Sequence, residues 1–192
     1  MPKRRKHATD EHRYPPINDY ALIGDCHSAA LVSRTGSIDW CCMPRIDAGS
    51  SFARILDWEH GGHWSIDATD EVRLSRSYVG NTMVLETHYA TASGEARVID
   101  CFATRPGGAT DPHRQLLRVV EGVRGVVAMR TEMRIRFDYG DIKPWLRFHK
   151  PGLWSATGGD DAVVINSDVE LEIIDTHDFR GEWTVRAGDR VH

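Results

Sequence analysis

Residues 17–56 decide the fold, and they read INDYALIGDCHSAALVSRTGSIDWCCMPRIDAGSSFARIL. The apolar runs predict two short strands over Tyr20–Ile23 and Ala29–Ser33, and a returning strand over Ser37–Met43. Gly36 lies between the last two of these strands and can adopt the positive φ that a tight turn requires. The stretch therefore predicts antiparallel hairpins rather than helices.

The returning strand leads into a charged loop. Its alternation predicts Ile38, Trp40 and Cys42 on one face, and Asp39 and Cys41 on the other. Pro44 has no N–H to donate to a ladder, so we expect the strand to end there. The segment RIDAGSS that follows is then a loop, after which SFARILDW predicts one or two helical turns.

The rest of the chain has a β pattern. Strands are expected over Glu71–Val79, Thr82–Thr91, Ala96–Phe102, Arg114–Glu121, Val126–Phe137, Trp145–His149, Leu153–Thr157, Ala162–Ile165, Val169–Ile174 and Trp183–Arg186. In the fifth of these, apolar side chains alternate with Arg130, Glu132, Arg134 and Arg136, which predicts one buried face and one that is exposed or covered by a polar partner. The fold class predicted is all-β, an antiparallel β-sandwich with at most one short helix after the Trp40 hairpin.

Several long blocks resemble one known family. The run DYALIGDCHSAALVSRTGSIDWCCMPRIDAGSSFARILD is similar to the opening of the glucoamylase- and trehalase-like enzymes of glycoside hydrolase family fifteen. The segments SRSYVGNTMVLETHY, GEARVIDCF and LLRVVEGVRGVVAMRTEMRIRFDYG follow in the same order as in that family. The chain departs from the pattern at Ile46, where the family has Phe, and at Ala48–Gly49, where it has Ser-Pro.

The resemblance implies a position and a role. It implies a β-sandwich over residues 17–192; the residues before it, 1–16, are polar and charged and end in Pro15-Pro16, so their composition predicts a disordered tail. The resemblance also places the catalytic glutamates on an (α/α)6 barrel that follows the sandwich. The chain has no such helical region, so we expect a non-catalytic domain that packs on a barrel, in cis or in trans, and shapes its cleft. The substrate implied is an α-glucoside such as trehalose or a maltooligosaccharide, with inverting hydrolysis.

Arg45, Asp47 and Trp40 are the candidate substrate-binding residues. In the position that the resemblance implies, Arg45 and Asp47 would reach the cleft and hydrogen-bond sugar hydroxyls. The alternative is that the two side chains pair with each other and only brace the loop. Trp40 is expected to pack between the sheets, whereas Trp145 is expected to be more exposed.

Other chemistry has less support. No catalytic residue is assigned, because 28 acidic residues make chance pairs unavoidable. The two glycines between His60 and His63 spoil a metal-binding geometry, and no metal or cofactor is expected. We expect Cys26 to be a packed thiol beside a surface His27 rather than a nucleophile.

Composition limits the partners and the compartment. The chain has 192 residues, 41% of them hydrophobic, and a net charge of −4, so we expect one domain and no nucleic-acid partner. No apolar run is long enough for a membrane span, and the basic start lacks the apolar region of a secretory signal. Four cysteines without a disulfide framework favour the cytoplasm. A free-standing carbohydrate-binding or homodimerising module remains the alternative function.

Overall fold

The computed structural model describes residues 14–108, 110 and 113–192. The expected tail over residues 1–16 lies almost entirely outside the described residues, so the boundary at residue 17 stays a prediction. The described part contains two short 3-10 helices, η2 (Ile17–Asp19) and η3 (Asp138–Gly140). The strands are β1 (Ala21–Gly24), β2 (Ala29–Val32), β3 (Ser37–Cys42), β4 (Ser50–Phe52), β5 (His63–Ala68), β6 (Arg73–Tyr78), β7 (Leu85–Ala90), β8 (Gly94–Phe102), β9 (Leu116–Arg134), β10 (Trp145–Lys150), β11 (Leu153–Gly158), β12 (Asp161–Asn166), β13 (Glu172–Ile174), β14 (Asp178–Arg186) and β15 (Arg190–Val191).

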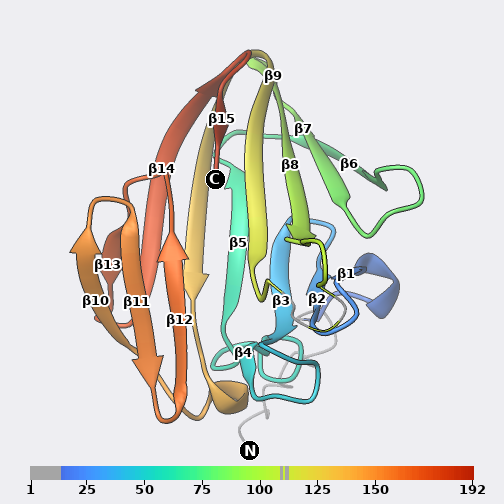
Figure 1. Cartoon of the computed structure of the whole chain (residues 1–192). Coiled ribbons are helices and arrows are strands. Elements are labelled where there is room, and N and C mark those ends of the chain that lie inside the picture. The colour runs from blue at the N-terminus through green and yellow to red at the C-terminus, as the bar shows by residue number, and fades with distance from the viewer. Residues whose placement is uncertain (1–13, 109, 111–112) are drawn as a thin grey trace, which may run out of the picture.

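The strands form two antiparallel sheets (Figure 1). The large sheet has twelve strands, with a central order β1-β2-β3-β5-β9-β8-β7-β6, and β4, β13, β14 and β15 join it at the sides. The small sheet has three strands in the order β10-β11-β12. The predicted all-β sandwich is confirmed, and most predicted strands lie within a few residues of the observed ones. No helix in the described ranges is long and apolar enough to cross a membrane.

Strand β9 is the centre of the large sheet. Its first half pairs with β8, and its second half lies between β5 and β14. The sequence predicted two strands, Arg114–Glu121 and Val126–Phe137, joined across residues 122–125, and the division into two strands is wrong, because one strand, β9, continues through these residues. Gly125 has a φ of +63°, and a side chain at Gly122 would collide with the carbonyl of Arg186. The glycines let the strand fold over at the top of the sandwich, so that its two halves run in opposite directions (Figure 1).

A β-bulge alters the side-chain alternation of β3. Leu31 pairs with Trp40 and Val32 pairs with Ile38, which leaves Asp39 as the extra residue. As a result, Ile38 and Cys41 belong to the same apolar cluster although they are three positions apart. The expected division of this strand into an Ile38 face and a Cys41 face is therefore wrong.

The segment after the charged loop is not helical. Ser50–Phe52 forms β4, which pairs with β3, and a hydrogen-bonded turn follows in which the N–H groups of Leu56 and Asp57 donate to the carbonyl of Ala53. The predicted helical turns over residues 51–58 are thus replaced by a strand and a turn, because pairing with β3 satisfies the backbone first.

Two apolar clusters form the core. The larger one fills the space between the second half of β9, the β1–β3 region and the small sheet, and includes the fully buried Ile23, Ile38, Ile135 and Phe179. The other lies among β5, β7, β8, β9 and β14, and includes Tyr89, Met129 and Val185. Both draw on the apolar face of β9, as its predicted alternation requires.

The two clusters are accompanied by buried ion pairs. Arg118 on β9 donates to Asp100 on β8 at 2.8 Å, and both side chains are fully buried. The same guanidinium donates to the carbonyls of Trp64 and Gly36, at 2.6 Å each. One side chain therefore ties together three strands and the turn before β3.

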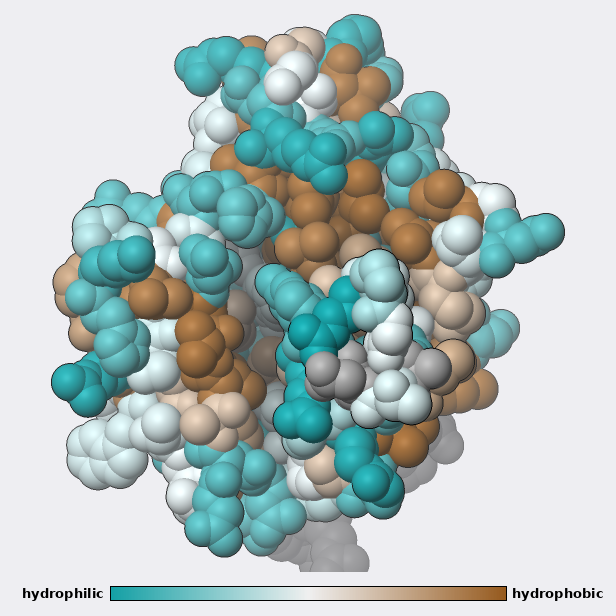
Figure 2. Space-filling model, in the orientation of Figure 1, coloured by the Kyte–Doolittle hydropathy of each residue, from teal (hydrophilic) through white to brown (hydrophobic). Residues whose placement is uncertain are grey.

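The small sheet exposes several apolar side chains. Trp145 is 78% exposed, Val164 73% and Phe148 53%. Figure 2 shows some apolar surface on the left part of the molecule, which a hollow separates from the rest. The expectation that Trp145 is exposed is confirmed.

Candidate functional site

The loop between β3 and β4 carries two of the predicted site residues. Arg45 donates to both carboxylate oxygens of Asp47, at 2.8 Å each, and the two side chains are 69% and 64% exposed. The hydrogen bond from Arg45 lowers the pKa of Asp47 and raises that of Arg45. The loop is tied to the sandwich by the Ile46 N–H, which donates to the carbonyl of His27 at 2.8 Å. The pair that could brace the loop is thus formed, and it is open to solvent.

Trp40 lies at the base of this loop. It is half-buried and belongs to neither apolar cluster, so the expectation that it packs between the sheets is wrong. Its ring instead lies against that of Tyr139, with centroids 5.9 Å apart and planes tilted by 38°. The structure thus pairs Trp40 with a residue that the sequence had not singled out.

Tyr139 is fixed at the same end of the sandwich as the loop. Its N–H donates to Ser50 Oγ at 2.9 Å, and Ser50 is the first residue of β4. Its φ of 61° lies in the left-handed region, as does the φ of 48° at Asp138. No apolar or charge pattern marks such a residue, and the Asp-Tyr-Gly run is the only local signal in the sequence.

A buried carboxylate lies behind Trp40. Asp39 accepts hydrogen bonds from Ser37 Oγ at 2.6 Å and from the Tyr20 hydroxyl at 2.9 Å. Burial raises its pKa, although both hydrogen bonds favour the charged form. Burial likewise raises the pKa of Tyr20. These two hydrogen bonds satisfy the buried carboxylate of Asp39, the bulge residue of β3, and give it a structural role.

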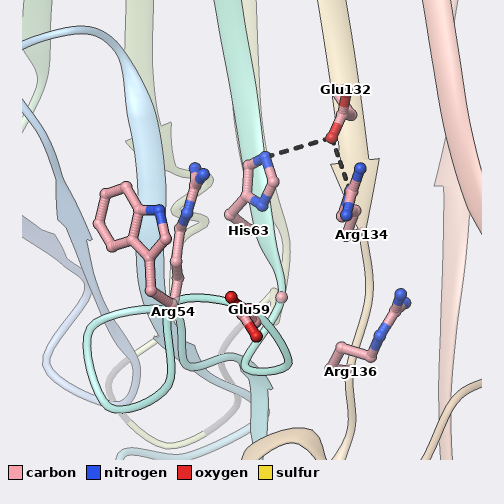
Figure 3. A pocket seen from close by; sticks show the side chains of 8 residues that line it. Arg54, Glu59, His63, Glu132, Arg134 and Arg136 are labelled. Atoms are coloured by element: carbon pink, nitrogen blue, oxygen red, sulfur yellow. Dashed lines mark hydrogen bonds and ion pairs between the residues drawn. The ribbon is translucent and has the colours of Figure 1, made fainter. Parts of the chain in front are cut away.

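A polar groove crosses the face of β5, β9 and β14. It consists of two adjoining pockets of about 300 and 490 Å³ that share Arg54, His63 and Glu132. Figure 3 shows dashed contacts from Glu132 to both His63 and Arg134, with Arg136 farther along the chain, past the end of β9. Arg134 donates to Glu132 at 2.6 Å, and His63 Nε2 lies 3.6 Å from the same carboxylate. The predicted polar face of β9 thus lines a groove.

Pairing within the groove neutralises most of its charges. Arg136 is buried rather than exposed, and it donates to both carboxylate oxygens of Asp178, at 2.6 and 3.1 Å. Arg130 faces Asp67 at 3.4 Å. The guanidinium of Arg54 lies 4.1 Å above the ring of Trp58, and its buried Nε has no hydrogen-bond partner among the described residues.

His63 is held neutral in this groove. Burial lowers its pKa from 6.5 to about 3, and the charges of Arg54, Arg134 and Arg136 act in the same direction. The carboxylate of Glu132 at 3.6 Å does not offset these effects, since the distance exceeds that of a good hydrogen bond. Because the unfolded chain binds the proton more readily, this residue contributes stability above about pH 6.5, which is lost as the pH falls towards 3.

The other sequence candidates are not brought into a site. His60 is exposed and pairs with Asp57 at 3.1 Å. In the part of the chain that the structure describes, no group of three or more His, Cys, Asp or Glu residues is placed to hold a metal. Cys26 is exposed rather than packed, and has a φ of 71°, so that expectation is corrected.

The fold and the groups just described define a class, an all-β sandwich domain with an exposed charged loop and a largely neutralised polar groove. The chain belongs to the family of trehalase-like N-terminal domains, which it matches over residues 3–186. The predicted resemblance to the N-terminal domain of trehalase-like proteins is therefore confirmed.

The similar proteins are much longer than this chain. The chain is 31% identical to the trehalase of Mycolicibacterium smegmatis, in a match that covers 93% of the chain and 30% of the relative. It is 32% identical to the trehalase of Mycobacterium tuberculosis over 66% of the chain and 21% of the relative. For the trehalase of Thermoplasma volcanium the identity is 28%, with coverages of 82% and 26%. The chain thus spans less than a third of each of these proteins, and no solved structure matches it.

Proposed function

We propose that this domain is the non-catalytic N-terminal part of an α-glucoside hydrolase, where it packs on an (α/α)6 barrel and shapes the barrel's cleft. The observation that carries the proposal is the family match over residues 3–186, together with trehalase relatives of which the chain covers less than a third. The barrel is joined in cis or supplied by another chain. The finer placement in glycoside hydrolase family fifteen, beside the glucoamylases, belongs to the same proposal.

The proposed substrate is an α-linked glucoside, with trehalose first, since the relatives are trehalases. Arg45, Asp47 and Trp40 are the proposed contacts. The exposure of Arg45 and Asp47 supports this role, because a charged pair in solvent can exchange its partner for sugar hydroxyls without losing a buried interaction. The free thiols of all four cysteines support a cytoplasmic location.

A chimeric enzyme tests the proposal. The N-terminal part of the Mycolicibacterium smegmatis trehalase, up to the end of its match with this chain, is replaced by this chain, and glucose release from trehalose is measured. We expect activity from the chimera and none from the catalytic part without an N-terminal domain. Glucose release by this chain alone, abolished when one of its own carboxylates is changed, would overturn the non-catalytic role.

The second candidate is a homodimerising or carbohydrate-binding module. The exposed Trp145 and Val164 on the small sheet favour it, because large exposed apolar side chains are typical of an interaction surface. Light scattering after size-exclusion chromatography distinguishes the two cases. A stable dimer that Trp145→Ser makes monomeric would favour the module.

A further inference from the structure

Tyr139 combines three properties that do not serve packing alone. Its side chain is 44% exposed, yet its backbone has a left-handed conformation that residues with a Cβ rarely adopt. The turn that holds it is closed by paired bonds between Phe137 and Ile142, at 3.0 and 3.1 Å. Phe137 itself is buried, so the turn is anchored in the core. The backbone that carries this aromatic ring is thereby fixed at the surface.

The position of this ring places it beside the charged loop. Trp40 precedes the loop on β3, and Ser50 follows it on β4. Tyr139 contacts both ends, because its ring lies against Trp40 and its N–H donates to Ser50 Oγ. In Figure 1 the short helix η3, which contains Tyr139, lies beside β4 at the lower end of the sandwich. Arg45 and Asp47 project from the segment between those two contacts.

A sugar ring offers two kinds of surface, apolar C–H groups and polar hydroxyls, and aromatic rings suit the first while charged hydrogen-bonding groups suit the second. The C–H groups of a pyranose ring pack on an aromatic face, while its hydroxyls both donate and accept hydrogen bonds. A guanidinium supplies only donors and a carboxylate only acceptors, so an adjacent pair can satisfy vicinal hydroxyls. A rigid ring costs little conformational entropy when it binds.

We propose that Tyr139 and Trp40 form an aromatic shelf on which a pyranose ring of an α-glucoside stacks while Arg45 and Asp47 bind its hydroxyls. This inference rests on the proposed function and adds Tyr139 as a binding residue. All four side chains belong to this chain, so the shelf binds sugar without the barrel.

Saturation-transfer NMR with trehalose and with maltotriose, on the full 192-residue chain, tests the shelf. We expect saturable binding that Tyr139→Gly weakens about tenfold or more, because the stacking contact is lost. Glycine tolerates the left-handed backbone, so the melting temperature of this variant should stay the same or rise. Tyr139→Phe keeps the ring and should retain binding within about threefold, since only the hydroxyl is lost.

Asp138→Gly is the matched control, because it changes the neighbouring left-handed residue without touching the ring, and it should bind as the unchanged chain does. Absence of saturable binding to either sugar, or Tyr139→Gly binding as tightly as the unchanged chain, overturns the shelf. The two proposals fail separately. If the chain binds sugar through Tyr139 but the chimeric enzyme is inactive, the shelf is supported and the proposed function is not. If the chimera is active but Tyr139→Gly has no effect on binding, the proposed function is supported and the shelf is not.

Discussion

Replacing Arg118 with methionine should destabilise the whole sandwich. The guanidinium is fully buried and donates to Asp100 and to the carbonyls of Trp64 and Gly36. Methionine fills much of the same volume but donates no hydrogen bond. The carboxylate of Asp100 then stays in the core without its cation, and two carbonyls lose a donor.

The expected loss is large for a domain of this size. Removing one partner of a buried ion pair costs about 3–5 kcal/mol, because the remaining charge stays desolvated. With a shift of about 2–4 °C per kcal/mol for a domain of this length, the melting temperature should fall by roughly 6–20 °C. Thermal unfolding followed by circular dichroism, together with urea unfolding, measures both quantities.

Two controls make the result interpretable. Arg124→Met removes an exposed pair with Glu95, whose side chains are 69% and 42% exposed, and should cost about 0–1 kcal/mol. The double change Arg118→Met with Asp100→Leu removes both buried charges and should be less destabilising than the single change. Equal losses of unfolding free energy for Arg118→Met and Arg124→Met would refute the reasoning, because burial would then not change how much an ion pair contributes to stability.

Three further outcomes are expected. The isolated chain should release no glucose from trehalose or maltose in a coupled glucose assay, and turnover that depends on one of its carboxylates would contradict this. In a version that carries a barrel, Arg45→Ala and Asp47→Ala should each lower kcat/KM about tenfold with an unchanged melting temperature, because hydrogen bonds to the substrate are lost. Normal hydrolysis with reduced stability would instead make the pair a brace. His63→Gln should reduce the pH dependence of unfolding between about pH 6.5 and 3, since this histidine no longer takes up a proton on unfolding, and identical urea titrations across that range would refute it.

Local turn chemistry made the hairpins predictable. Gly36, with a φ of +83°, closes the turn before β3, and Gly80, with a φ of +54°, lies in the turn between β6 and β7. The predicted alternation over residues 126–137 gave the buried face of β9, including Met129 and Met133. These features depend on neighbours within a few positions, so they can be read from the sequence.

The errors came from long-range pairing. Gly122 and Gly125 have the composition of a turn, and the chain does reverse there (Figure 1), but pairing with β8, β14 and β15 continues the ladder on both sides, so one strand spans the reversal. Arg136 continues a charged alternation and is nevertheless buried, because Asp178 from a distant strand neutralises it. Tyr139 has no sequence pattern of its own, since its conformation depends on Ser50 and on the closed turn.

The contrast between the charged pairs explains how one domain can be both rigid and adaptable. Arg118 with Asp100, and Arg136 with Asp178, are buried and cannot exchange partners without exposing the core. Arg45 with Asp47 is solvent-exposed, and water already competes for its hydrogen bonds. Such a pair can hold the loop in the free protein and turn to a ligand when one binds. Ionic strength separates the two roles: salt should weaken a loop held mainly by this pair, whereas hydrogen bonds to a neutral sugar should respond much less.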